Sequence, residues 1–224
     1  MQFDTSHLSL DEAKHIIDSL TPFAWPQRLA RFHQVLMQRR QDITCLLCRF
    51  FDPHNNAAVI RSAEGLGLPA VHLIPGKQGA AINQGVSMHA DQWMTIYQHD
   101  DENQAAMALK NAGYLLIGAD IAGEPLETLT LPHTSKVCLV MGSEKQGLTP
   151  AIKPHCSQFI RIPMQGMVES FNVSVAAALL LQSLLSKLDK IPLDALTYQQ
   201  QLAGFLLQSV EQSEAILRRQ NIKL

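Results

Sequence analysis

The chain alternates between short apolar runs and longer stretches in which apolar residues recur every three or four positions. Runs rich in β-branched and aromatic residues predict strands, and the longer spacing predicts amphipathic helices. Strands are expected at residues 45–51, 71–74, 93–97, 114–119, 137–141 and 159–162. Helices are expected between them, one ending near residue 66 and others covering residues 103–111, 148–156 and 172–188. This alternation favours an α/β fold in which helices cover both faces of a parallel sheet.

Both ends of the chain have a helical pattern. Ser9 and Glu12 have the spacing of a capping box, which predicts a first helix that ends near residue 20. A second helix is expected at residues 27–40, and a last helix at residues 194–219, after a linker at Ile191-Pro192. We therefore expect three parts: a helical extension at residues 1–41, an α/β domain at residues 42–190 and a second helical extension at residues 191–224.

The composition is that of a globular protein, with 46% hydrophobic and 17% charged residues among 224. The apolar runs are shorter than a membrane span, and the first residues lack the basic start and apolar core of a signal peptide. We expect a cytoplasmic protein that binds no membrane. Cys45 and Cys48 form a C-x-x-C pattern inside an apolar run without a second pair, so buried thiols are favoured over zinc. Nine scattered histidines give no support for a metal site.

The net charge of −2 does not point to nucleic acid, but the distribution of charge does. Residues 27–40 contain four arginines and no acidic residue. Such a helix can be a solvated surface, or it can attract phosphates, because that attraction is local and screened within about 10 Å.

Two glycine patterns resemble nucleotide-binding motifs but stand in the wrong place. The G-x-G-x-x-A spacing at residues 65–70 ends a predicted helix and precedes a strand, which indicates a helix C-cap turn. Residues 142–147 begin like a P-loop, but Leu148 stands where a lysine is required. Neither a G-x-S-x-G nor an H-E-x-x-H pattern occurs. The sequence therefore does not support a nucleotide-dependent oxidoreductase.

The stretch from residue 159 to residue 181 has the most distinctive chemistry. Its strand ends at Pro163, a loop with Gly166 follows, and from Asn172 the apolar spacing is helical. A structural interpretation is a strand, a loop and a buried helix with Ser170 and Asn172 as N-caps. A functional interpretation is that the loop, which also contains Met164 and Met167, binds a flat and partly apolar ligand through its backbone.

Three segments in this order resemble the signature motifs of the SpoU/TrmH-type RNA 2′-O-ribose methyltransferases of the SPOUT class. They are residues 55–61, with an asparagine six positions before an arginine, residues 139–148, with Gly-Ser-Glu, and residues 162–179. The resemblance covers about residues 26–190. Asn56 and Phe171 depart from the family pattern, and residues 87–93 keep Trp93 but lose a glycine- and serine-rich run.

The resemblance implies a SPOUT fold with a C-terminal trefoil knot, and methyl transfer from S-adenosylmethionine to a ribose 2′-hydroxyl. Transfer RNA is favoured as the substrate. Ribosomal RNA, or a non-catalytic RNA-binding protein with a cofactor pocket, is the alternative. It also implies a homodimer in which both subunits contribute to each site, with the apolar face of helix 172–188 as the expected interface.

The residues that the resemblance assigns fall into three groups. The catalytic set is Asn55, Arg61, Glu144, Ser170 and Asn172. The cofactor set is Ala119, Gly142, Ile162, Met167 and Phe171. The RNA-binding set is Arg28, Arg31 and Arg39. Enzymes of this kind are proposed to use the arginine at the position of Arg61 as a general base, but a guanidinium keeps its proton, with a pKa above about 12. Arg61 is therefore either that base or a clamp that holds the phosphate and stabilises the developing alkoxide. A bulky residue at Gly142 is expected to block the cofactor and leave the fold intact.

Overall fold

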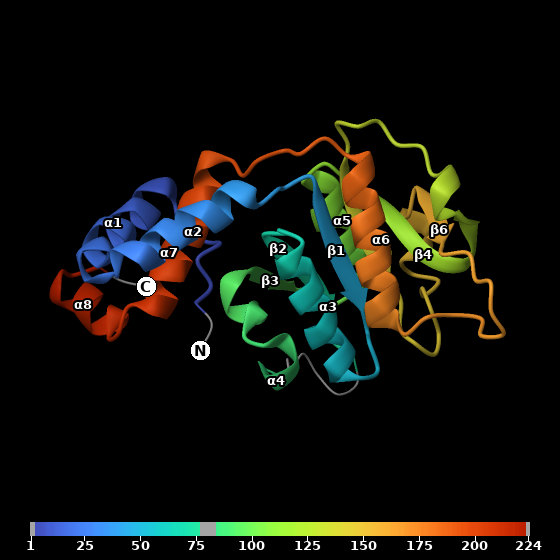
Figure 1. Ribbon diagram of the computed structural model, residues 1–224, viewed down its shortest axis with the longest axis horizontal. Coiled ribbons are helices and arrows are strands. Elements are labelled where there is room, and N and C mark those ends of the chain that lie inside the picture. The colour runs from blue at the N-terminus through green and yellow to red at the C-terminus, as the bar shows by residue number, and fades with distance from the viewer. Residues whose placement is uncertain (1–2, 77–83, 223–224) are drawn as a thin grey trace.

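A parallel sheet forms the centre of the α/β part of the protein (Figure 1). The computed structural model describes residues 3–76 and 84–222. Within these residues the sheet has six strands in the order β3-β2-β1-β5-β4-β6, and every pair is parallel. The strands are β1 (Ile43–Cys48), β2 (Ala70–Ile74), β3 (Thr95–Gln98), β4 (Tyr114–Pro125), β5 (Lys136–Met141) and β6 (Gln158–Arg161). The predicted parallel sheet is thus confirmed.

Helices cover both faces of this sheet. Cys45 and Leu47 of β1 pack into the same core as helices α3 (Pro53–Gly65) and α6 (Val173–Lys187). Leu46 and Cys48 point to the other face, where α5 (Glu102–Asn111) packs. Because successive side chains of a strand point to opposite faces, Cys45 and Cys48 cannot meet at one metal ion, and both are buried free thiols.

The two ends of the chain form one helical unit. Helices α1 (Leu10–Leu20) and α2 (Pro26–Gln38) pack against α7 (Ala195–Ser209) and α8 (Ser213–Arg219) around a second core, beside the sheet (Figure 1). Ser9 and Glu12 form the predicted capping box of α1. The two extensions predicted as separate parts are therefore parts of one unit, because each leaves an apolar face that the other covers.

The helical unit is joined to the α/β domain by an aromatic and a polar contact. Trp93, from the short helix η2 (Ala90–Trp93), packs edge-on against Phe205 of α7, with 5.4 Å between the ring centroids. The ring centroid of Phe32 of α2 lies 5.2 Å from that of Phe205. Beside them, Arg39 donates a 2.6 Å hydrogen bond to Gln201 and pairs with Glu64 at 3.3 Å. The junction is packed and not a loose tether.

One predicted helix is wrong and another is interrupted. Residues 148–156 contain only the 3-10 turn η4 (Lys153–His155), because Pro154 lacks the backbone N–H that a continuing helix needs. The last helix is split into α7 and α8 by Gln212, whose φ of 56° is left-handed. Gly67, with φ of 84°, forms the predicted turn after α3. None of the helices in the described residues is long and apolar enough to span a bilayer.

Candidate active site

The motif residues meet at the carboxyl edge of the sheet. Since all strands are parallel, the loops that follow β1, β4, β5 and β6 leave from this edge. The loop after β1 leads into α3, the loop after β5 carries Glu144, and the segment after β6 leads to α6. Asp52 caps α3 by accepting a 2.9 Å hydrogen bond from the backbone of His54, which sets the start of the helix that carries Asn55.

Glu144 joins the first motif to the second. Its carboxylate accepts hydrogen bonds from Nδ2 of Asn55 at 2.6 Å and from the backbone of Phe51 at 2.8 Å. A third, longer bond comes from the backbone of Asp52 at 3.4 Å. The backbone donors of Phe51 and Asp52 were not foreseen from the sequence, because a backbone N–H has no signature of its own. Glu144 therefore fixes the turn between β1 and α3.

Asn55 extends this network to the third motif. Its Oδ1 accepts a 3.2 Å hydrogen bond from Nδ2 of Asn172. Asn172 caps α6, since its Oδ1 accepts from the backbone of Ser174 at 2.8 Å. We call this chain of Glu144, Asn55 and Asn172 the motif clasp. It ties together three segments, because Glu144 and Asn172 lie 89 and 117 residues from Asn55 along the sequence.

The clasp keeps Glu144 ionised. Partial burial by itself would raise the pKa of the carboxyl group, but the hydrogen bonds from Phe51, Asn55 and Asp52 outweigh it and lower the pKa. The lowered pKa makes this carboxylate a weaker base than an unperturbed glutamate. In this geometry it accepts a hydrogen bond from Asn55, which in turn accepts one from Asn172.

Arg61 and Ser170 are not part of the clasp. Arg61 lies on α3 six residues after Asn55, about 9 Å further along the helix axis and on another face. Its side chain is exposed and makes no hydrogen bond or ion pair with the other described residues. Ser170 is exposed in the loop before α6 and does not cap that helix, which begins after Asn172.

Gly142 is required by the fold. A Cβ atom at this position would lie 2.1 Å from the backbone carbon of Gly147. The close approach belongs to a tight loop in which Ser143 and Gly147 exchange backbone hydrogen bonds of 3.2 and 2.8 Å. The expectation that a bulky residue at Gly142 leaves the fold intact is therefore wrong, since any side chain displaces the loop that presents Glu144.

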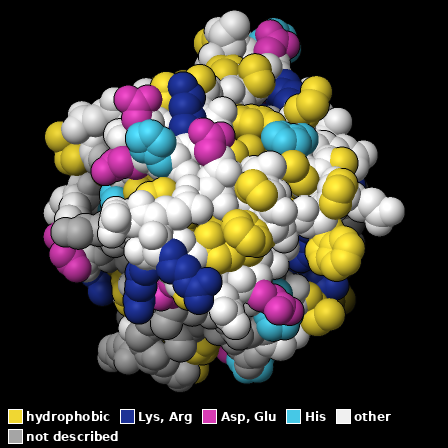
Figure 2. All heavy atoms as spheres, turned by 90° about the vertical axis from the view of Figure 1, so that its left-hand side faces the viewer, with side chains coloured by type: hydrophobic (Ala, Val, Ile, Leu, Met, Phe, Trp, Pro, Cys, Tyr) yellow, Lys and Arg dark blue, Asp and Glu magenta, His cyan; other side chains and the backbone are white. Residues whose placement is uncertain are grey.

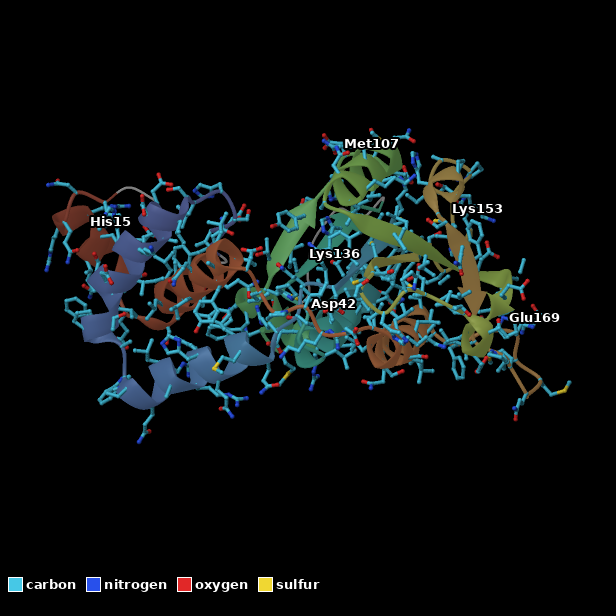
Figure 3. The ribbon with its side chains drawn as sticks, turned by 90° about the horizontal axis from the view of Figure 1, so that it is seen from above. His15, Asp42, Met107, Lys136, Lys153 and Glu169 are labelled. Carbon is cyan, nitrogen blue, oxygen red and sulfur yellow. The ribbon has the colours of Figure 1, made fainter. Side chains whose placement is uncertain are left out.

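The cofactor set has a buried part and an exposed part. Gly142 is buried, and Ala119 and Ile162 are half-buried. Gly142 directly follows β5 and Ile162 directly follows β6, whereas Ala119 lies within β4, where the register against β6 shifts. Met167 and Phe171 are exposed in the loop before α6, which projects at the end of the molecule away from the helical unit, where Figure 3 labels Glu169. Adjacent strand ends with backbone groups and small or apolar side chains fit a flat, partly apolar ligand such as S-adenosylmethionine.

The predicted RNA-binding arginines are not equivalent. Arg28 and Arg31 are exposed on α2. Arg39 is 1% exposed, and its guanidinium is held by Gln201, by Glu64 and by the ring of Phe205, whose centroid is 5.1 Å away. Burial lowers the pKa of Arg39 to about 10, opposed by Glu64. The structure therefore contradicts the assignment of Arg39 to an RNA surface, because it is a junction residue.

Comparison with known proteins agrees with this geometry. The profile of the SpoU rRNA Methylase family matches residues 42–182. The chain belongs to this family. The match includes the whole clasp, so the prediction of an RNA methyltransferase that uses S-adenosylmethionine is confirmed.

Several relatives of this SpoU family member are named tRNA (guanosine(18)-2′-O)-methyltransferase. The one from Borreliella burgdorferi is 29% identical over 90% of this chain and 93% of its own length. The one from Escherichia coli is 32% identical over 70% of this chain and 68% of its own. The one from Thermus thermophilus is 31% identical over 80% of this chain and 95% of its own.

Solved structures share the fold of this SpoU family member. The crystal structure of the Aquifex aeolicus TrmH/SpoU tRNA modifying enzyme superposes with a TM-score of 0.64 at 23% identity, over 88% of this chain and 98% of that one. A SpoU methyltransferase from Streptomyces viridochromogenes, solved in complex with the cofactor AdoMet, has a TM-score of 0.54 over 68% of this chain and 60% of that one. Because the sequence identities are only 23% and 22%, these two comparisons establish a shared fold and nothing further.

Proposed function

We propose that the protein transfers the methyl group of S-adenosylmethionine to the 2′-hydroxyl of a ribose in transfer RNA. The observation that carries this proposal is the motif clasp, which brings the three SpoU motifs together at one edge of the sheet. The names of the relatives make guanosine 18 the first nucleotide to test.

The cofactor supplies a methyl group on a sulfonium, which is already a good leaving group. The protein then has to hold the ribose in line with that methyl group and to assist loss of the hydroxyl proton. We assign the cofactor to the backbone at Ala119, Gly142, Ile162 and Phe171, with Met167 beside it. The apolar character of the loop before α6 supports this assignment.

We assign Arg61 to the ribose and its phosphate. A guanidinium can stabilise the alkoxide that develops as the proton leaves, and can hold the phosphate through two parallel hydrogen bonds. Its exposure and its lack of a described partner leave its donors free for RNA. Asn55, Glu144 and Asn172 hold the loops in place, and Ser170 lies exposed in the same region for contact with the bound molecules.

We further propose that the active form is a homodimer. The face of α6 predicted as the interface, with Ala177, Leu180 and Leu184, instead belongs to the core of the subunit. A different face exposes Val175 and Leu179, each 45% exposed and one helical turn apart. With Met167, Val168 and Phe171 in the preceding loop, these residues form an apolar strip that we assign to the second subunit. A dimer through this strip also explains how Arg61, which is remote from the clasp of its own chain, can serve a site.

The trefoil knot of the family is proposed for this chain as well. Strand β6 lies at one edge of the sheet, next to β4 and then β5. Helix α6, which follows β6 in the chain, packs into the same core as α3, beyond β4 and β5. This course of the chain supports the proposal.

Methylation with labelled S-adenosylmethionine tests the proposed function. The purified protein is offered unmodified transfer RNA and, in parallel, ribosomal RNA. We expect label in transfer RNA at a single ribose, which blocks alkaline cleavage at that nucleotide. Label only in ribosomal RNA would select the alternative substrate that the departures at residues 87–93 leave open. Cofactor binding without transfer to any RNA would identify a non-catalytic binding protein.

A further inference from the structure

Two aromatic side chains are exposed at the corner between η1 (Thr21–Phe23) and α2. Trp25 is 82% exposed and Phe23 is 57% exposed. An aromatic ring has a large surface that gains free energy on burial, so neighbouring exposed rings mark a binding surface. Both lie outside the motif clasp and outside the apolar strip on α6, so neither the catalytic site nor the proposed dimer accounts for them.

The corner is rigid. Pro22 in η1 and Pro26 at the start of α2 restrict the backbone on both sides of Trp25. The backbone of Ala24 donates a 3.1 Å hydrogen bond to Thr21, and Leu29 donates a 3.0 Å bond to the carbonyl of Trp25. The rings therefore stand on a fixed backbone, so that less conformational entropy is lost when a ligand binds.

The charge around the corner is positive. Residues 21–41 contain four arginines and no carboxylate. Arg39 and Arg40, beyond the far end of α2, pair with Glu64 and Asp42, whereas Arg28 and Arg31 are exposed on its first two turns. The guanidinium of Arg28 lies 5.6 Å from the ring of Trp93 and 5.7 Å from that of Phe32, which fixes its position at the junction. Figure 2 shows this end of the molecule, where exposed hydrophobic side chains lie beside lysine and arginine side chains.

We propose that Phe23 and Trp25 form a stacking platform for an unpaired base of the RNA substrate, with Arg28 and Arg31 on the adjacent phosphates. The proposal rests on the proposed function. An aromatic ring accepts any base on its face, and nearby cations hold the backbone of the same strand. Arg31 lies about 9 Å from Trp25 along the helix axis, which is close to the screening length of about 8 Å in physiological salt.

Affinity for unmodified transfer RNA, measured by filter binding over a range of salt concentrations, separates the two kinds of contact. Trp25→Ala should weaken binding about tenfold at every salt concentration, because a lost stack releases no counterions. Arg28→Ala combined with Arg31→Ala should instead reduce the slope of affinity against salt by about two phosphate contacts. Met37→Ala is the matched control, since Met37 is 70% exposed on the same helix but near its other end. It should leave affinity unchanged.

Fluorescence tests the stacking directly. Trp25 and Trp93 are the two tryptophans of the chain, so Trp93→Phe makes Trp25 the single reporter. Addition of a single-stranded oligonucleotide should quench its emission, and an abasic oligonucleotide of the same length and charge should quench it much less. Equal quenching by both strands, or unchanged RNA affinity in Trp25→Ala, would overturn the proposal. A change in the mass of the assembly in Trp25→Ala, with RNA affinity unchanged, would assign the corner to a protein contact and would also overturn it.

The stacking proposal and the proposed function can be tested separately. Methyl transfer at saturating transfer RNA tests the reaction, and there Trp25→Ala should retain the wild-type rate with a KM raised about tenfold. A protein that transfers no methyl group to RNA would contradict the proposed function, while the quenching measurement would still decide whether a base stacks on Trp25.

Discussion

Arg61 and Glu144 belong to the same set of motif residues but differ in surroundings. Glu144 is held by three hydrogen bonds, whereas the donors of Arg61 have no partner among the described residues. We predict that Arg61→Ala folds normally and binds S-adenosylmethionine with wild-type affinity, but loses methyl transfer by several orders of magnitude. Calorimetry and single-turnover methylation provide the two measurements.

Arg61→Lys separates the two roles of this residue. A lysine keeps the charge but lacks the planar fork, and its pKa of about 10.4 falls more readily on burial. We expect Arg61→Lys to recover little methyl transfer at any pH, because a geometric clamp needs the planar fork. Recovery that grows with pH would indicate proton abstraction, and near-normal activity in Arg61→Ala would show that the arginine has no catalytic role.

His72 makes stability depend on pH. It is packed between the ring of Tyr97 and His99, with 2.8 Å between Nδ1 of His72 and Nε2 of His99. Burial, aided by His99, lowers the pKa of His72 to about 3, while in the unfolded chain it is about 6.5. The unfolded state therefore binds more protons between these values, and stability falls as pH is lowered through this range.

We predict a loss of up to about 2 kcal/mol in the free energy of unfolding between pH 7 and pH 5. Urea denaturation at each pH measures it. His72→Phe keeps an aromatic ring in the stack and should flatten the dependence. An equally steep loss in His72→Phe would assign the effect to other groups, among which His99 also has a lowered pKa because of burial.

At the scale of elements, α6 has two apolar faces with different roles. One face packs into the core of the subunit, and the other exposes Val175 and Leu179. We predict that Val175→Lys combined with Leu179→Lys converts the proposed dimer into a monomer of 24.8 kDa, because each buried aliphatic side chain contributes about 1.5–3 kcal/mol. Sedimentation velocity measures the mass.

The control for this experiment is Met107→Lys. Met107 is exposed on α5, on the opposite face of the sheet, and is labelled in Figure 3. It should leave the mass unchanged. A monomeric wild-type protein, or a double variant that remains dimeric, would contradict the assignment of the strip on α6.

At the scale of the whole molecule, Arg39 joins the helical unit to the α/β domain. Its partners are Gln201 of α7 and Glu64 at the end of α3, the helix that begins beside the clasp. We predict that Arg39→Ala lowers the free energy of unfolding by roughly 2–4 kcal/mol, because it leaves a cavity and unpaired polar groups.

Thermal denaturation and RNA binding together distinguish this role from a contact with RNA. Arg39→Ala should lower the melting temperature and leave the salt dependence of RNA binding unchanged. Arg28→Ala combined with Arg31→Ala should do the opposite. If Arg39→Ala instead had normal stability and a flatter salt dependence of RNA binding, Arg39 would be assigned to the RNA-binding surface.

Local patterns in the sequence were sufficient for the parts that depend on local forces. The spacing of apolar residues predicted the six strands and the parallel sheet, since strands that are apolar on both faces are typical of a parallel sheet covered by helices. The capping box at Ser9 and Glu12 and the turn at Gly67 follow from side-chain and backbone preferences of a few neighbouring residues. The three motifs identified the family because their order and separations are unlikely together.

Only the tertiary structure decided which motif residues touch one another and which arginines are exposed. Arg28, Arg31 and Arg39 look alike in the sequence, but α7, whose Gln201 lies 162 residues beyond Arg39, buries that arginine and leaves the other two in solvent. In the same way, Glu144 and Asn172 reach Asn55 only because parallel strands return their carboxyl ends to one edge of the sheet. Contacts between distant segments depend on how the elements pack, and a single sequence carries no local pattern for them.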